Sequence, residues 1–135
     1  MSEIRETPPP EPSSIRGGSD IEDQITLSTS APAAGQVVVE VGGEVDMLTS
    51  PHLRAAVLEQ FETAGVHIVV LVLDEVTFLG TSGLAVLIEV REAAQVANVT
   101  LRLVCTARRV LRPLTIAGLL PLFDVRKTLS NALAS

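Results

Sequence analysis

Two adjacent hydroxyl residues, Thr81-Ser82, are the part of the sequence best placed for chemistry. They lie in the stretch Leu-Gly-Thr-Ser-Gly-Leu of residues 79–84, between an apolar run and a helical pattern, which predicts a turn from a strand into a helix. Hydroxyl groups at such a turn commonly cap the free N–H groups of the helix. A hydroxyl there is also accessible, and the helix dipole would tolerate a phosphate on it. Capping and modification of Ser82 therefore both stay open.

The two histidines of the chain do not support a serine hydrolase. His52 falls in the first turn of a predicted helix and His67 at the start of a predicted strand, where histidine is usually structural or exposed. The Gly-x-Ser-x-Gly pattern of a nucleophile elbow is absent around Ser82. We therefore do not expect a Ser-His-Asp triad.

Other kinds of reactive site fit the sequence poorly. Glu44 and Asp46 share one face of a predicted strand, and Asp74-Glu75 are adjacent, but both pairs are interpreted as polar residues at exposed strand ends. No phosphate-binding Gly-x-x-x-x-Gly-Lys motif occurs, and Lys127 is the only lysine. One cysteine and two histidines do not make up a structural zinc site. We expect no metal, no cofactor and no enzymatic activity.

Composition restricts the class of protein further. The 135 residues carry 10 Lys and Arg against 16 Asp and Glu, a net charge of -6, and the three Phe are the only aromatic residues. Such a chain lacks the means to neutralise phosphates and to stack on bases, so we expect no direct nucleic-acid binding. The single cysteine, Cys105, cannot form an internal disulfide and is expected to be reduced and buried.

Membrane segments and leaders are not apparent in the sequence. The apolar run of residues 68–73 is too short to span a bilayer, and residues 76–88 include Thr, Ser and Gly. Residues 1–12 contain acidic residues and prolines where a signal peptide needs an apolar stretch. We therefore expect a cytoplasmic protein that does not contact a membrane.

The sequence predicts a tail followed by one α/β domain. Half of residues 1–20 are Pro, Gly or Ser, so this part is expected to be a flexible tail and residues 21–135 the domain. Strands are predicted near residues 21–28, 36–45, 67–73, 99–105 and 122–125, and helices over residues 50–64, 82–97, 107–117 and 128–134. This alternation predicts a mixed, mostly parallel sheet whose first strand is antiparallel.

Single residues predict where these elements end or become irregular. Ser50 is expected to cap the first helix, and Gly65 to close it. Asn98 is expected to stop the second helix, and Pro113 to kink or shorten the third. The pair Gly42-Gly43 predicts a bulge or a close backbone approach in the second strand.

Four stretches of the sequence, in this order, resemble the signature of STAS-domain anti-sigma factor antagonists. They are residues 43–46 (Gly-Glu-Val-Asp), residues 50–53 (Ser-Pro-x-Leu), residues 73–84 (Leu-Asp-x-Val-x-Phe-Leu-Gly-Thr-Ser-Gly-Leu), and Arg-x-Leu at 109–111 followed by Gly-Leu-x-x-x-Phe at 118–123. The resemblance covers about residues 22–134. It implies an α/β fold with a mixed sheet of four or five strands and helices packed chiefly on one side.

The resemblance also implies a function. Members of this family perform no catalysis; they bind an anti-sigma factor, itself a serine kinase, and so release a sigma factor for transcription in a stress response. The kinase switches the antagonist off by phosphorylating a serine in an Asp-Ser-Ser-Gly-like turn, and a serine phosphatase restores it. Matched by position, Ser82 is the phospho-acceptor, Thr81 is the alternative acceptor, and Asp46 lies beside the turn. Partner binding is then expected at Asp46, Gly80, Thr81, Ser82 and Gly83 of a monomer or weak dimer.

Gly80 departs from the family pattern, because many relatives have Asp at this position. The change removes a negative charge and a hydrogen-bond acceptor, and it adds backbone freedom. It keeps a second hypothesis open, in which the chain is a STAS-like scaffold or ligand-sensing module without a phospho-switch.

Five of the ten basic residues lie in the last third of the chain. They form either a patch for an acidic partner or an ordinary solvated surface. These residues are Arg108, Arg109, Arg112, Arg126 and Lys127.

Overall fold

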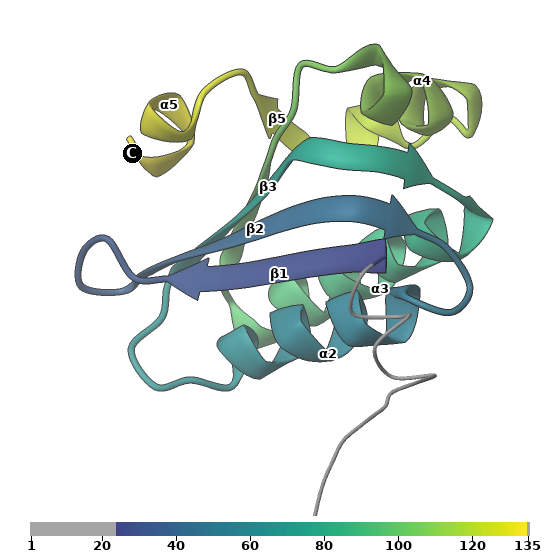
Figure 1. Ribbon diagram of the computed structural model, residues 1–135. Coiled ribbons are helices and arrows are strands. Elements are labelled where there is room, and N and C mark those ends of the chain that lie inside the picture. The colour runs from purple at the N-terminus through teal and green to yellow at the C-terminus, as the bar shows by residue number, and fades with distance from the viewer. Residues whose placement is uncertain (1–23, 135) are drawn as a thin grey trace, which may run out of the picture.

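Runs of β-branched and leucine residues form the centre of a five-stranded sheet in the computed structural model, which describes residues 24–134 (Figure 1). The strands lie in the order β1 (Ile25–Ser30), β2 (Gln36–Val45), β3 (Ile68–Leu79), β4 (Thr100–Val104) and β5 (Asp124–Arg126). Strand β1 is antiparallel to β2, and the other neighbours are parallel. The predicted mixed, mostly parallel sheet is confirmed, whereas the predicted tail of residues 1–20 lies outside the described residues.

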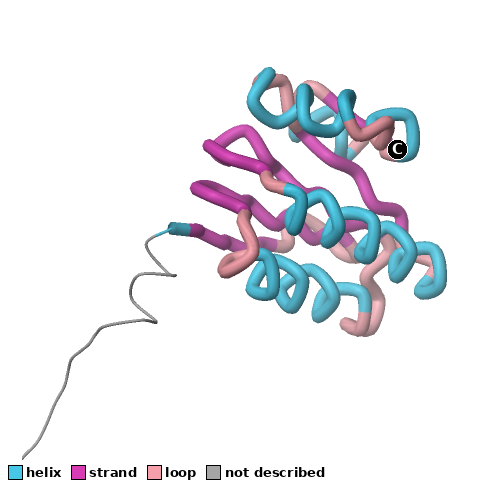
Figure 2. The backbone as a smooth tube through the Cα atoms, turned by 90° about the vertical axis from the view of Figure 1, so that its right-hand side faces the viewer, coloured by secondary structure: helices cyan, strands magenta, loops and turns pink. Residues whose placement is uncertain are grey.

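The helices pack chiefly on one side of this sheet, as predicted. Helices α2 (Ser50–Phe61) and α3 (Thr81–Ala97) lie side by side against one face (Figures 1 and 2). Helix α4 (Arg108–Ile116) and the short 3-10 turn Leu120–Leu122 pack onto the same core, while α5 (Leu129–Leu133) packs on the opposite face. Within residues 24–134, no helix is long and apolar enough to span a membrane.

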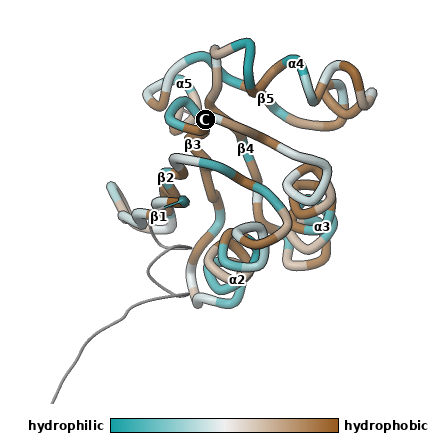
Figure 3. The backbone as a smooth tube through the Cα atoms, turned by 45° about the vertical axis from the view of Figure 1, so that its right-hand side comes forward, coloured by the Kyte–Doolittle hydropathy of each residue, from teal (hydrophilic) through white to brown (hydrophobic). Residues whose placement is uncertain are grey.

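Alternation along the central strands divides the core into two parts. Val39 of β2, Leu71 of β3 and Leu103 of β4 are fully buried on the side of α2 and α3. Their neighbours Val38, Val70 and Val104 are buried against α5 on the other side, where Ala132 is also fully enclosed. Because both faces are covered, residues 37–39 of β2 and 68–73 of β3 are apolar without interruption, and the centre of the sheet is largely brown in Figure 3.

Strand β3 is longer than predicted. The continuous apolar run predicts a strand that ends at Leu73, but β3 continues to Leu79. Its last part stays paired with β2, with Val76 opposite Gly43 and Leu79 opposite Val45, and only Val76 and Leu79 in it are buried. Strand β4 pairs with β3 only as far as Val72. The end of β3 therefore extends beyond the centre of the sheet.

Two predicted helix ends are wrong. The N-cap of α2 is Thr49 rather than Ser50, which is already the first residue of the helix, and no side chain accepts a cap hydrogen bond there. Gly65 does not close α2, since the helix ends at Phe61 with Glu62 as its C-cap, and Gly65 lies in the following turn with φ of +85°.

Two other expected irregularities are confirmed. Asn98 ends α3 in the left-handed conformation with φ of +62°. Pro113 lies within α4, and the helix continues for three residues beyond it. The register of β2 against β3 shifts on both sides of Gly42-Gly43, as expected for a bulge.

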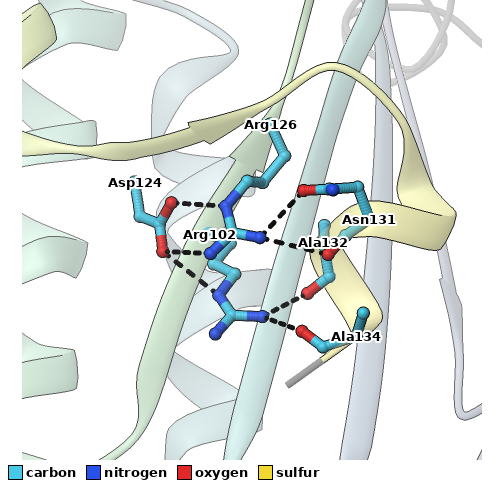
Figure 4. A network of polar contacts seen from close by, with 6 residues as sticks. All are labelled: Arg102, Asp124, Arg126, Asn131, Ala132 and Ala134. Atoms are coloured by element: carbon cyan, nitrogen blue, oxygen red, sulfur yellow. Dashed lines mark hydrogen bonds and ion pairs between the residues drawn. The ribbon is translucent and has the colours of Figure 1, made fainter.

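A network of arginines fixes α5 to the edge of the sheet (Figure 4). The Arg102 guanidinium donates to the carbonyl oxygens of Ala132 and Ala134, at 2.7 and 2.8 Å. It also pairs with Asp124 at 3.2 Å, and Asp124 in turn pairs with Arg126 at 2.6 Å. Arg102 thus supplies donors to carbonyl groups that the end of a short helix leaves free.

Candidate functional site

The ends of β2 and β3 bring the candidate residues together. The Gly80 N–H donates to the Val45 carbonyl oxygen at 2.9 Å, which joins the residue before α3 to the last residue of β2. Asp46 follows Val45 directly, and Thr81 and Ser82 are the first residues of α3. The site therefore lies at the carboxyl end of two parallel strands, where functional loops of α/β proteins collect.

The hydroxyl groups of Thr81 and Ser82 do not cap α3. The N-cap residue is Gly80, and no side chain accepts a cap hydrogen bond there, so the capping interpretation is wrong. A capping side chain must belong to the residue just before the helix, whereas Thr81 and Ser82 are the first two residues of the helix itself. The first N–H groups of a helix have no partner within the helix. Thr81 is exposed and Ser82 is half-buried beside these groups.

The two glycines of the turn play different parts. Gly83 is buried, and an added Cβ would lie 2.6 Å from a methyl group of Leu79 and 2.7 Å from one of Val45. Gly83 thus allows α3 to approach the end of β2. Gly80 has φ of -89° and ψ of -178°, an extended conformation open to any residue, and its added Cβ would meet chiefly the Phe78 ring. The backbone itself therefore does not demand glycine at position 80.

Asp46 organises the turn between β2 and α2. Its Oδ1 accepts hydrogen bonds from the N–H groups of Leu48 and Thr49, both at 3.0 Å. The Thr49 N–H is the main cause that lowers the pKa of Asp46 below its usual value, with further bonds from the Thr49 hydroxyl and the Leu48 N–H. Thr49 is fully buried; its hydroxyl donates to the Glu44 carbonyl at 2.7 Å and accepts from the Asp46 N–H at 2.9 Å. These hydrogen bonds favour the ionised form of Asp46 and link it to Leu48 and Thr49 at the start of α2.

This turn presents two apolar side chains that the sequence analysis missed. Met47 is 77% exposed and Leu48 is 59% exposed. Their signal in the sequence is two long apolar residues between a strand end and the start of a helix, outside the helical spacing that marks the core face. Exposed apolar groups that gather beside a candidate site are typical of a surface for protein binding.

A groove lies on the other side of Thr81, between α3 and α4, and we refer to it as the α3–α4 groove. Its volume is about 520 Å3, and ten residues of β3, α3, α4 and their adjoining turns line it: Phe78, Leu79, Gly80, Thr81, Leu84, Arg109, Arg112, Pro113, Ile116 and Ala117. Phe78 is 53% exposed and Ile116 is 74% exposed. Sequence reasoning missed this groove because it needs the position of α4 relative to β3, which no local pattern contains.

Arg109 holds α4 beside the end of β3. Its guanidinium donates to the carbonyl oxygens of Val76 at 2.6 Å and Asp74 at 2.9 Å. The Asp74 carboxylate accepts the Thr106 N–H at 3.0 Å, which fixes the segment between β4 and α4 to the same strand. These bonds set the width of the groove.

The late basic residues do not act as one patch. Arg126 is bound to Asp124 and Asn131 beside α5, whereas Arg109 and Arg112 line the α3–α4 groove. Arg108 and Arg112 also border a smaller hollow on α4. Three of the five basic residues therefore lie together on α4, whereas Arg126 and Lys127 lie at the end of β5.

Other candidate residues are not gathered into a reactive centre. His67 precedes β3 and Ser82 follows it, so the length of the strand separates them; among the described residues no hydrogen bond joins His52 to Ser82. Residues 24–134 hold no cluster of three His, Cys, Asp or Glu suited to a metal ion. Cys105 is buried, and burial, with the nearby charge of Asp74, raises the pKa of its thiol to about 11.

The fold agrees with one protein family. The STAS domain family matches residues 27–132, so the chain belongs to the STAS domain family. The resemblance to its anti-sigma factor antagonists, drawn from the sequence motifs, is thereby confirmed together with the fold. None of the curated proteins compared with the chain matches it.

Solved structures of anti-sigma factor antagonists are similar to the chain. An antagonist from Mycobacterium paratuberculosis is 30% identical, with a TM-score of 0.71 over 82% of this chain and 92% of that one. SpoIIAA in its unphosphorylated form is 17% identical, with a TM-score of 0.68 over 80% of this chain and 93% of that one. The phosphorylated form of SpoIIAA, a cell fate determinant of Bacillus, is 16% identical, with a TM-score of 0.63 over 80% of this chain and 96% of that one. At these lower identities the likeness to SpoIIAA concerns the fold.

Proposed function

We propose that this chain is an anti-sigma factor antagonist that binds an anti-sigma factor kinase in the cytoplasm and releases it when Ser82 is phosphorylated. The observation that carries the proposal is the turn 80–83, whose hydroxyl groups are left free by the Gly80 cap at the start of α3. Its structural relatives support the role: one is an anti-sigma factor antagonist at 30% identity, and SpoIIAA has a phosphorylated and an unphosphorylated form.

The partner surface would consist of the turn with the apolar groups on both sides of it. Met47 and Leu48 flank it on one side, and Phe78 and Ile116 on the other. Asp46 would act by holding the Met47-Leu48 turn in place, while Gly80, Thr81, Ser82 and Gly83 would lie at its centre. A phosphate on Ser82 adds a charge of about -1.5 to -2 at the middle of this apolar surface. Because a bound partner would have to bury the phosphate away from water, phosphorylation opposes binding.

The test compares the wild-type chain with Ser82→Asp as baits in cells of the source organism. We expect the wild type to capture a serine kinase and Ser82→Asp to lose it, while the matched control Ser130→Asp, at an exposed serine on α5, retains it. The purified kinase with ATP should then place phosphate on Ser82, and Thr81 is the alternative position. Equal capture by both variants, or a phosphate elsewhere that persists in Ser82→Ala, would contradict the switch.

Gly80 supports a second candidate, a STAS scaffold or ligand-sensing module without a phospho-switch. Because the backbone at Gly80 accepts other residues, Gly80→Asp restores the family carboxylate without strain in φ. If the kinase phosphorylates Gly80→Asp faster than wild type, the result favours a phospho-switch in which Gly80 weakens recognition by the kinase. A bound small molecule in native mass spectrometry, with no phosphorylation of either protein, would favour the module.

A further inference from the structure

The α3–α4 groove has an apolar wall and a basic wall. Phe78 and Ile116 supply the first, and Arg109 and Arg112 on α4 supply the second. Arg109 donates to two carbonyl oxygens, which bind its N–H groups but carry no full charge to neutralise it. A segment that fits the groove should therefore combine carboxylates with a few aliphatic side chains.

Positive charge on α4 is not balanced inside the domain. Within residues 24–134, carboxylates pair with Arg54, Arg102 and Arg126, but no such pair involves Arg108 or Arg112. Both side chains belong to exposed residues of α4. Arg108 and Arg112 are therefore available to pair with a carboxylate that comes from outside residues 24–134.

The chain contains such a segment in residues 1–23. These residues include six acidic and two basic side chains, whereas residues 24–135 include ten acidic and eight basic ones. Most of the net charge of -6 therefore belongs to this segment rather than to the domain. The segment also contains three isoleucines, at positions 4, 15 and 21, suited to an apolar wall.

The segment joins the domain at the same end as the groove. Because β1 is antiparallel, its first residue, Ile25, lies opposite Gly43, and Gly43 lies opposite Val76. Neighbouring strands are about 4.8 Å apart, so β1 and β3 are separated by about 10 Å. An extended stretch of about ten residues spans about 33 Å, so much of the segment can reach the groove.

We propose that residues 1–23 dock in the α3–α4 groove of the same chain. Their carboxylates face Arg112 in the groove and Arg108 in the adjoining hollow on α4, and an isoleucine contacts the wall formed by Phe78 and Ile116. The link to β1 provides an effective concentration in the millimolar range, so a weak contact is sufficient to fill the groove.

A nitroxide label at Ser14→Cys tests the docking in the full chain. We expect amide signals of Thr81, Leu84 and Ile116 to lose on the order of half their intensity or more, while Gly35 and Gly65 at the opposite end keep theirs. Wild type treated with the same reagent is the matched control, because its only thiol is the buried Cys105. High salt should restore part of the lost intensity, since it screens the arginines.

Charge reversal on α4 provides the second measurement. In Arg108→Glu/Arg112→Glu we expect most of the groove broadening to disappear, whereas Arg54→Glu, at another exposed arginine on α2, should leave it unchanged. Reversing two carboxylates of the segment, Glu6→Arg/Glu11→Arg, should restore the broadening in the α4 variant. Unchanged amide dispersion in each variant shows that the domain stays folded.

Three results would overturn the proposal. One is no selective broadening at the groove, and another is broadening that survives the α4 charge reversal. The third comes from a mixture of spin-labelled unenriched chain with unlabelled 15N-enriched chain. Groove broadening of the enriched chain in this mixture would assign the groove to the segment of a second copy instead.

Discussion

Gly83 is the residue that allows α3 to begin against the end of β2. The space for its missing side chain is occupied by methyl groups of Leu79 and Val45. Both belong to the core of the domain, so they have little freedom to move aside. The position of Thr81 and Ser82 over the strand ends thus depends on a residue that has no side chain.

We expect Gly83→Ala to lower the free energy of unfolding by about 1–3 kcal/mol, the usual cost of overpacking a core. Gly80→Ala is the matched control, because its added Cβ meets mainly the exposed Phe78 ring. Urea denaturation of both variants measures the difference. Equal stabilities would show that α3 can shift away from β2 without cost.

The thiol of Cys105 is expected to be inert in the folded protein. Its pKa is raised to about 11, so at neutral pH almost none of it is the reactive thiolate, and its side chain is buried. Iodoacetamide should therefore modify the native chain far more slowly than the chain in urea, as followed by mass spectrometry. Rapid native alkylation would instead favour a redox role for this cysteine.

At the level of residues, the sequence could name candidates but not their contacts. Ser82 and Asp46 are candidates from the motif, and the hydrogen bonds by which Asp46 holds the turn through Leu48 and Thr49 could not be read from it. Capping by Thr81 and Ser82 was a reasonable expectation from residue type. It failed because the helix starts one residue earlier than expected, and local patterns do not fix a helix end that closely.

Among the elements, α5 depends most on side-chain hydrogen bonds. It is five residues long, too short to be stable alone, and Arg102 holds its last carbonyl oxygens. We expect Arg102→Met to destabilise the domain by about 1–3 kcal/mol and to speed amide exchange first in α5. Hydrogen exchange followed by mass spectrometry should show this, and Arg54→Met on α2 should leave α5 exchange unchanged.

The same network predicts a loss of stability in acid. The hydrogen bond from Arg126 is the main cause that lowers the pKa of Asp124 below its usual value, and Arg102 adds to it. A lowered folded-state pKa means that the stabilisation is complete above the unfolded pKa, about 3.9, and is lost as the pH falls through the folded value. The stability difference between wild type and Asp124→Asn should therefore shrink below about pH 4. A difference that is constant from neutral pH into this range would contradict the role of the Asp124 charge.

The buried hydroxyl of Thr49 also holds the junction of β2 with α2. Thr49→Val keeps the shape of the side chain but leaves the Glu44 carbonyl and the Asp46 N–H without this partner. We expect a loss of about 1–3 kcal/mol in thermal or chemical unfolding. Thr115→Val, which removes an exposed hydroxyl bond within α4, should cost less.

For the whole molecule, the surface on both sides of Thr81 should determine binding of the anti-sigma factor. Phe78→Ser/Ile116→Ser is expected to weaken binding at least about tenfold, the effect of losing about 1.4 kcal/mol, with little change in thermal stability because both side chains are exposed. Val96→Ser is the matched control, since Val96 is 90% exposed at the far end of α3. Isothermal titration with the captured partner checks this prediction.

The fold as a whole was predictable because its signals are local and repeated. The β-branched runs of β2 and β3 and the helical spacing of α2 and α3 follow one another in the order of an α/β domain. The extension of β3 to Leu79 and the α3–α4 groove were not predictable, because they depend on pairing and packing between distant residues.

The extension of β3 also leaves a strand edge that β4 does not cover. Beyond Val72 that edge has carbonyl groups without a neighbouring strand, and Arg109 binds two of them, at Asp74 and Val76. An open edge is a template on which other chains add strands and aggregate. Arg109 thus supplies hydrogen-bond donors that a neighbouring strand would otherwise provide. Loss of Arg109 would leave this edge open to self-association while the core of the domain stayed intact.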